Sequence, residues 1–278
     1  MASLPSYRLL GVNVMAATLE EGRRRTLELA HATDGRGRYV VLPYVEFLTK
    51  AADQPELASL LNQADLCLPN GVALVWAAHY LYAGRPGLGR CFTTLASIVL
   101  APGRLNRPLE ARFDSANLTW PLLEAAAAKD LSVWLIGSPK RQSIEQTAAH
   151  LQQAIPALKI SGTTKGILSE DSIKDMTERL RQAKPDLILV GLGFPLQEQL
   201  MQRLSRQLTG AVMIGEGGSF DYEAFGGRIK RAPLWLRRLG LEWAWRLIRE
   251  PSRIKRVMAI PYFIWLIYRQ GRRPASQP

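Results

Sequence analysis

Short apolar runs alternate with longer amphipathic segments along most of the chain. The runs end near glycine, proline or asparagine, which is typical of buried strands that stop at a turn. We expect strands at residues 7–14, 38–42, 64–68, 132–136, 158–162, 186–190 and 211–214. We expect helices at residues 18–32, 45–61, 71–83, 117–128, 140–153, 169–183 and 196–207. This alternation predicts an α/β fold with a Rossmann-like, mostly parallel sheet and helices on both faces.

Residues 84–110 interrupt this alternation. Two stretches rich in glycine and proline, GRPGLG and APGRLNRP, flank a small apolar segment there. Glycine and proline are strong punctuators of regular structure. The pattern therefore predicts a loop, and it fits either a plain connection or a lid over a neighbouring site.

Glycines follow three of the expected strands, and they suggest where a ligand would bind. Ligands of parallel α/β sheets lie at the carboxyl ends of the strands, where glycine lets backbone amides approach a phosphate or a sugar. Each glycine is also compatible with a tight turn, but the three sites together favour a nucleotide-type ligand. The chain contains neither the GxGxxG fingerprint nor a P-loop motif. The glycines are Gly137, the pair Gly191 and Gly193, and Gly215 with Gly217 and Gly218.

The positive charge of the chain is concentrated near its C-terminus. The formal net charge is +12, and residues 228–273 hold thirteen basic residues against two acidic ones. Tryptophans are interleaved with these charges, which suits an anionic membrane surface better than a nucleic acid. We therefore expect an α/β core at residues 1–227 and a basic, amphipathic, helical appendage for membrane docking at residues 228–278.

The sequence predicts attachment to a membrane without crossing it. The apolar run at residues 257–268 is shorter than the roughly 20 residues that span a bilayer, and Pro261 interrupts it. The N-terminus lacks a basic region followed by an apolar core, so no secretory signal is expected. These features predict a cytoplasmic protein that lies on the inner face of the cell membrane.

No cofactor or metal is expected from the residue patterns. Cys67 and Cys91 form no CxxC motif and are expected as buried thiols in a reducing compartment. The histidines are scattered and make no pattern of metal ligands, and no DxD motif is present to hold a divalent ion beside a diphosphate. Both a monomer and a homo-oligomer remain open.

Four stretches of the chain resemble the bacterial WecG/TagA/CpsF glycosyltransferase family. They are residues 132–140 (SVWLIGSPK), 191–198 (GLGFPLQE), 215–221 (GEGGSFD) and the long basic stretch 230–256. Members of that family transfer a sugar from a UDP-sugar to a polyprenyl-diphosphate-linked acceptor during the assembly of cell-surface polysaccharides. The resemblance implies an inverting, metal-independent hexosyltransferase with a Rossmann-like core, which acts on these two substrates in polysaccharide biosynthesis of the cell envelope.

The resemblance also implies roles for individual residues. The arginines Arg246, Arg253 and Arg256 match family arginines that reach toward the diphosphate of the acceptor. The alternative is that they only face lipid headgroups. Asp221 would either contact the nucleotide or hold its own glycine turn. The residues expected to bind the donor are Gly71, Arg112, Gly137, Gly191, Gly193, Gln197, Glu198, Gly217, Gly218 and Asp221.

The chain departs from the family at a catalytic position. Asn70 stands where the family has the aspartate proposed as its base, and an amide cannot take a proton at neutral pH. Asp114 is the nearest candidate for a substitute base, and it is equally suited to cap the helix that starts near Asn117. Two hypotheses follow, namely an active transferase that uses Asn70 and Asp114, and a catalytically inert relative that binds a UDP-sugar as a membrane-associated partner.

Overall fold

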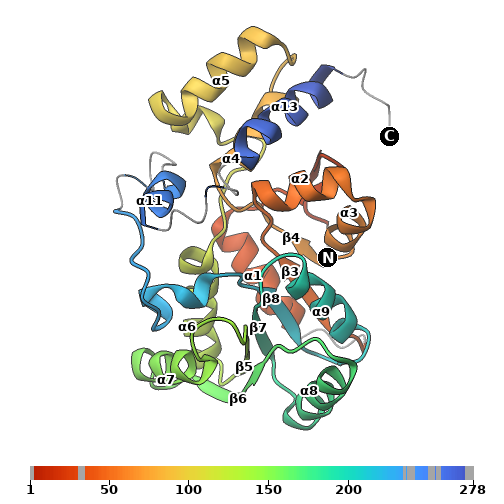
Figure 1. The fold of residues 1–278 in the computed structure, drawn as a ribbon, viewed down its shortest axis with the longest axis vertical. Coiled ribbons are helices and arrows are strands. Elements are labelled where there is room, and N and C mark those ends of the chain that lie inside the picture. The colour runs from red at the N-terminus through yellow and green to blue at the C-terminus, as the bar shows by residue number, and fades with distance from the viewer. Residues whose placement is uncertain are drawn as a thin grey trace.

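The computed structural model describes residues 3–30, 35–233, 236, 242–249, 254 and 258–272 (Figure 1). Within these residues the central sheet has six strands, all parallel to their neighbours. They are β3 (Arg38–Val41), β4 (Leu66–Cys67), β5 (Ser132–Gly137), β6 (Lys159–Lys165), β7 (Leu187–Gly191) and β8 (Val212–Gly215). Their order across the sheet is β4-β3-β8-β7-β5-β6. The predicted α/β fold is confirmed.

Helices cover both faces of the sheet, because alternate residues of a strand point to opposite sides. Leu187 and Leu189 of β7 pack into one hydrophobic core, and Ile188 and Val190 pack into the other. The first core is closed by α1 (Leu19–Ala30), α6 (Trp120–Ala128) and α7 (Ile144–Ala154). The second is closed by α2 (Val45–Asp53), α3 (Pro55–Asn62), α4 (Val72–Tyr82), α8 (Glu170–Ala183) and α9 (Leu196–Ser205).

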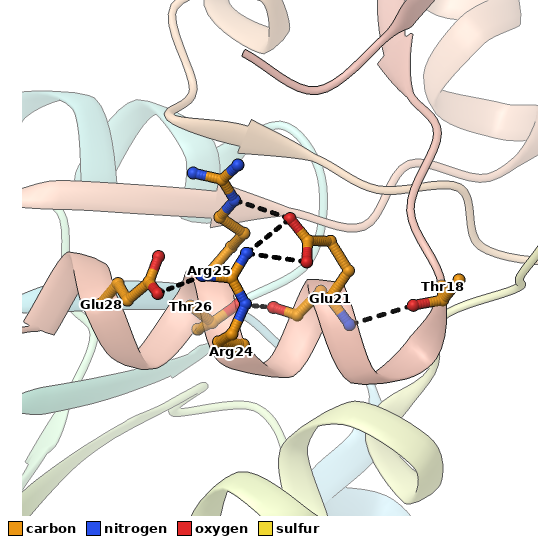
Figure 2. A network of polar contacts seen from close by, with 7 residues as sticks. Thr18, Glu21, Arg24, Arg25, Thr26 and Glu28 are labelled. Carbon is orange, nitrogen blue, oxygen red and sulfur yellow. Dashed lines mark hydrogen bonds and ion pairs between the residues drawn. The ribbon is translucent and has the colours of Figure 1, made fainter. Parts of the chain in front are cut away.

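Helix α1 leads from the N-terminal segment to β3 and has one charged face. Figure 2 shows the Thr18 hydroxyl accepting the N–H of Glu21 at 3.1 Å, which satisfies a free amide at the start of the helix. The Glu21 carboxylate in turn accepts from Arg24 at 2.7 Å and from Arg25 at 2.9 Å. These pairs lie three and four residues apart, where side chains on a helix surface meet. The opposite side of α1, with Thr26, is buried against the sheet.

The strand expected at residues 7–14 is a β-hairpin instead. Strands β1 (Ser6–Leu9) and β2 (Val12–Met15) pair antiparallel in a separate two-stranded sheet. Leu10 and Gly11 form the turn with φ values of +49° and +87°. Two consecutive left-handed residues give the tight hairpin turn that matches the twist of the strands. The apolar pattern continues through this turn, which explains why the sequence suggested a single strand.

The helix expected at residues 45–61 is divided into α2 and α3. Proline lacks an N–H and disfavours helical geometry in the residue before it. Gln54 accordingly has extended backbone angles, φ −132° and ψ 96°, and Pro55 opens α3. The division lets α2 contact the C-terminal helix while α3 packs against β2 and α9.

The prediction of a loop at residues 84–110 is wrong. This segment contains helix α5 (Leu88–Leu100), followed by a 3-10 turn, η1 (Pro102–Leu105). Packing decides its structure, because α5 buries Cys91 and Thr94 against α4, and Trp76 donates its indole N–H to the Thr94 hydroxyl at 3.0 Å. The flanking glycines and prolines, which indicated a loop, mark the ends of this helix.

Within the described C-terminal residues, α11 (Glu242–Arg249) and α13 (Ala259–Arg272) are helical. Helix α13 packs on α2 and α4, and its Phe263 and Ile267 are fully buried. Among the described residues, no helix is long and apolar enough to span a bilayer. The predicted boundary between residues 227 and 228 stays a prediction. The remaining helical turns are η2 (Ser115–Thr119), η3 (Ser219–Asp221) and η4 (Glu223–Phe225).

Candidate functional site

A cavity of about 1130 Å³ opens where strands β3, β4, β7 and β8 end, and we call it the edge cavity. Leu42 lines it after β3, Asn70 after β4, Gly193 after β7 and Glu216 after β8. Parallel sheets bind ligands at this edge because successive loops converge there. The edge cavity therefore lies where the glycine pattern predicted a ligand.

Gln197 joins the two glycine loops of the edge cavity. Its side-chain oxygen accepts the N–H of Gly193 at 3.1 Å and the N–H of Gly217 at 2.8 Å. Both glycines have left-handed backbones, with φ values of +83° and +57°, which other residues rarely adopt. The amide nitrogen of Gln197 donates to the Glu198 carboxylate at 2.8 Å. A buried network thus fixes the loops after β7 and β8 relative to each other.

Both predicted catalytic residues, Asn70 and Asp114, line the edge cavity. Six of the ten predicted donor residues line it as well, and the other four do not. The six are Gly71, Arg112, Gly193, Gln197, Gly217 and Gly218. Gly191 sits where an added Cβ would lie 2.5 Å from the Phe220 ring, and Gly137 where it would lie 2.7 Å from Ile144. Glu198 is fully buried, and Asp221 pairs with Arg141. These four residues contact the loops that shape the cavity, and their predicted role in donor binding stays a prediction.

The predicted acceptor residues lie largely outside the described part of the chain. Arg246 falls within α11, but its side chain is not among the described ones. Arg253 and Arg256 lie outside the described residues. Their role toward the acceptor or the lipid therefore stays a prediction.

Asp114 faces the edge cavity with both carboxylate oxygens engaged. Oδ1 accepts the backbone N–H groups of Ala116 at 2.8 Å and Asn117 at 3.0 Å. The side-chain oxygen of Asn117 in turn accepts the backbone N–H of Asp114 at 2.8 Å. This is a capping box at the start of η2. Oδ2 accepts from Arg231 at 2.9 Å. The helix-capping role left open by the sequence is therefore present, together with an ion pair.

Glu216 lies in the wall of the edge cavity, and the sequence reasoning did not single it out. Glu216 is only 5% exposed, and the Thr119 hydroxyl donates to its Oε1. Burial raises the pKa of this carboxyl from 4.5 to about 7, against the hydrogen bond of Thr119, and the negative charge of Asp114 raises the pKa further. Its place between the glycines of the GEGG stretch was the available signal.

Two further arginines line the edge cavity without having been predicted. Arg141, in the loop after β5, forms an ion pair with Asp221, and an added Cβ on Gly218 would lie 2.6 Å from its guanidinium. Arg231 pairs with Asp114 and lies over the Tyr222 ring, 5.6 Å from its centroid. With Arg112 they give the cavity three guanidinium groups. Guanidinium groups and backbone amides are the donors that diphosphates prefer.

The edge cavity offers guanidinium, amide and carboxylate groups to a ligand. No group of three or more histidine, cysteine, aspartate or glutamate side chains could hold a metal ion among the residues that the structure describes. Asn70 can hydrogen-bond a hydroxyl but cannot remove its proton. Carboxylates, by contrast, are available as proton acceptors at Asp114 and Glu216.

The glycosyl transferase WecG/TagA/CpsF family model matches residues 7–95 and 96–277 of the chain. A relative from Bacillus spizizenii is 26% identical over 250 residues, covering 90% of this chain and 86% of the relative. One from Bacillus subtilis is 32% identical over 175 residues, covering 63% and 66%. One from Staphylococcus aureus (strain MW2) is 29% identical over 235 residues, covering 84% and 81%. Each is named as an N-acetylglucosaminyldiphosphoundecaprenol N-acetyl-beta-D-mannosaminyltransferase.

Proposed function

The chain belongs to the WecG/TagA/CpsF family of glycosyl transferases, and from this premise we propose that it transfers a sugar from a UDP-sugar to a saccharide on a polyprenyl diphosphate. The observation that carries this proposal is the edge cavity itself. It places guanidinium groups beside two glycine loops that Gln197 holds together, at the carboxyl edge of a parallel sheet. Guanidinium groups match the diphosphate of a nucleotide sugar.

The names of the relatives support a finer assignment of both substrates. Each names an N-acetylmannosaminyl group as the sugar transferred and N-acetylglucosaminyl diphosphoundecaprenol as the acceptor. We propose the same donor sugar and acceptor class for this chain, in the assembly of a cell-envelope polymer. In this scheme Arg112 and Arg141 contact the donor diphosphate, and Asn70 orients a hydroxyl of the bound sugars without ionising it. The choice of Asp114 as the base stays a prediction.

Exposed apolar side chains at one end of the molecule support the proposal that the protein docks on a membrane surface. Helices α5 and α13 both lie at the end of the molecule opposite β6 (Figure 1). They expose large apolar side chains, and Arg269 lies over the Trp265 ring at 5.3 Å, a pairing suited to the headgroup region. Ile260 of α13 lines the edge cavity, so this end borders the site. The exposed side chains are Leu88, Phe92, Val99, Leu100, Tyr262 and Trp265.

Binding to vesicles tests the membrane surface. Phe92 and Leu100 are 66% and 81% exposed, so replacing both by glutamate should disturb no core packing. We expect Phe92→Glu with Leu100→Glu to lower co-sedimentation with anionic vesicles at least several-fold, because charged side chains resist transfer into the interface. Ile167→Glu, at an exposed apolar residue after β6, is the matched control. Unchanged binding of the double variant would refute a docking role for α5.

UDP release tests the transfer itself. We expect release when UDP-N-acetylmannosamine and the N-acetylglucosaminyl lipid diphosphate are both present, and little release with either alone. The presence of Asn70 favours a second function, that of an inert relative which binds the nucleotide sugar. Calorimetric binding of the UDP-sugar without UDP release from any donor and acceptor pair would support that function instead.

A further inference from the structure

Glu216 is the first residue after β8, at the point where the sheet meets the edge cavity. Its backbone is fixed by its own N–H, which donates to the Val190 carbonyl at 2.8 Å. Its backbone carbonyl accepts from the Ser219 hydroxyl at 2.7 Å. The side chain is therefore carried by a rigid strand end and not by a mobile loop, as a group that acts on a substrate must be.

The two carboxylate oxygens of Glu216 have different surroundings. Oε1 accepts the hydroxyl proton of Thr119, a fully buried residue of η2. Oε2 is buried and has no hydrogen-bond partner among the residues that the structure describes. A buried carboxylate oxygen without a partner is costly unless a ligand supplies one. Because Glu216 lines the edge cavity, a bound hydroxyl group is the partner that this position would accept.

The other carboxylates of the edge cavity are less suited to remove a proton. Asp114 uses one oxygen for the helix cap and the other for Arg231. Glu46 pairs with Lys50 at 2.9 Å. Glu20 and Glu110 are exposed to solvent at the cavity lining. Glu216 alone among these lining carboxylates combines burial with an oxygen that has no partner in the described chain.

We propose that Glu216 is the general base of the transfer, in place of the aspartate that Asn70 replaces. Its carboxylate takes the proton of the acceptor hydroxyl as that oxygen bonds to the anomeric carbon of the donor sugar. The bond between this carbon and the diphosphate oxygen breaks, and its electron pair leaves with UDP. This inference rests on the proposed function. In this assignment Asp114 is a positioning residue that orients η2 and Arg231.

The charges around Glu216 set the pH range in which it acts. Asp114 faces it from the start of η2 and is paired with Arg231, while Arg141 on the β5 loop is paired with Asp221. Arg112 lines the same cavity. Burial is the main cause that raises the pKa of Glu216 to about 7. A general base is most effective when its pKa lies near the pH at which the enzyme works. The rate should therefore fall as the pH drops below about 7.

The test compares kcat and kcat/KM across pH 5 to 9 for the full chain and its variants, because the pH dependence of kcat/KM reports the pKa of the free enzyme. General-base assistance is commonly worth about 10²–10⁴ in rate. We expect Glu216→Gln to lower kcat by about that factor and to abolish the decline below pH 7, while UDP-sugar binding measured by calorimetry stays close to wild type. Glu216→Asp should retain the decline. Glu178→Gln, at an exposed carboxyl of α8 that does not line the cavity, is the control and should leave the pH dependence of kcat in place.

Three outcomes would overturn the inference. Full activity of Glu216→Gln, or an unchanged decline of its rate below pH 7, would show that Glu216 takes no proton. Loss of the decline in Asp114→Asn but not in Glu216→Gln would assign the base to Asp114. Absence of UDP release from the wild type would refute the proposed function together with the inference, whereas the first two outcomes leave the transferase assignment intact.

Discussion

Glu198 should make the stability of the protein depend on pH, and Glu198→Gln isolates its contribution. The carboxyl is fully buried on α9, and Gln197 donates to one of its oxygens at 2.8 Å. Burial raises its pKa from 4.5 to about 7, against the hydrogen bonds from Gln197 and from its own backbone. Glutamine has the same shape, keeps an acceptor for Gln197, and carries no charge at any pH.

The sign and size of the effect follow from proton linkage. A raised pKa in the folded state means that the folded protein holds a proton between pH 4.5 and about 7 that the unfolded chain has released. The free energy of unfolding is therefore highest at and below pH 4.5 and falls as the pH rises toward 7. A shift from 4.5 to about 7 corresponds to about 3 kcal/mol. Glu198→Gln should thus be more stable than wild type by about 3 kcal/mol at pH 8, and close to wild type at pH 5.

Urea unfolding followed by tryptophan fluorescence at pH 5 and pH 8 measures this difference. Glu56→Gln, at an exposed position on α3, is the control and should shift stability little between the two pH values. If the free energy of unfolding of Glu198→Gln differs from that of the wild type by the same amount at both pH values, the buried carboxyl does not change its ionisation between pH 5 and pH 8. A variant less stable than wild type at pH 8 would show that the charge is stabilised by contacts other than those described.

Three further substitutions test the walls of the edge cavity. Gly191→Ala should lower the free energy of unfolding by about 1–3 kcal/mol in urea titrations, because its Cβ would lie 2.5 Å from the Phe220 ring; stability within 0.5 kcal/mol of wild type would contradict the packing. Gln197→Leu leaves the N–H groups of Gly193 and Gly217 without an acceptor, so calorimetry should show UDP-sugar binding weakened about tenfold or more. An affinity equal to that of the wild type would show that these two hydrogen bonds do not hold the binding loops in place. Asp221→Asn removes the negative charge that pairs with the half-buried Arg141 but keeps an acceptor oxygen, and the same assay should show a change of only a few-fold.

The sequence by itself located the parallel sheet and the edge at which the cavity opens. Strands buried on both faces read as continuous apolar runs, so β7, expected at residues 186–190, is found at Leu187–Gly191. Glycines after these strands pointed to the loops that line the edge cavity, and Gly193 and Gly217 are there. The four family-like stretches indicated the family that the comparison then showed. These signals are local, because strand burial and turn geometry are encoded within a few neighbouring residues.

The tertiary structure alone decided which side chains meet. Helix α5 exists because Thr94 and Cys91 pack on α4, a contact that local propensity does not record. Thr119 and Glu216 are 97 positions apart in the chain, yet the one donates to the other. A glutamate between glycines resembles a turn residue in sequence, and only the folded structure buries its carboxyl beside the edge cavity and raises its pKa. Desolvation and distant hydrogen bonds arise only after the chain has folded, so no local pattern carries them.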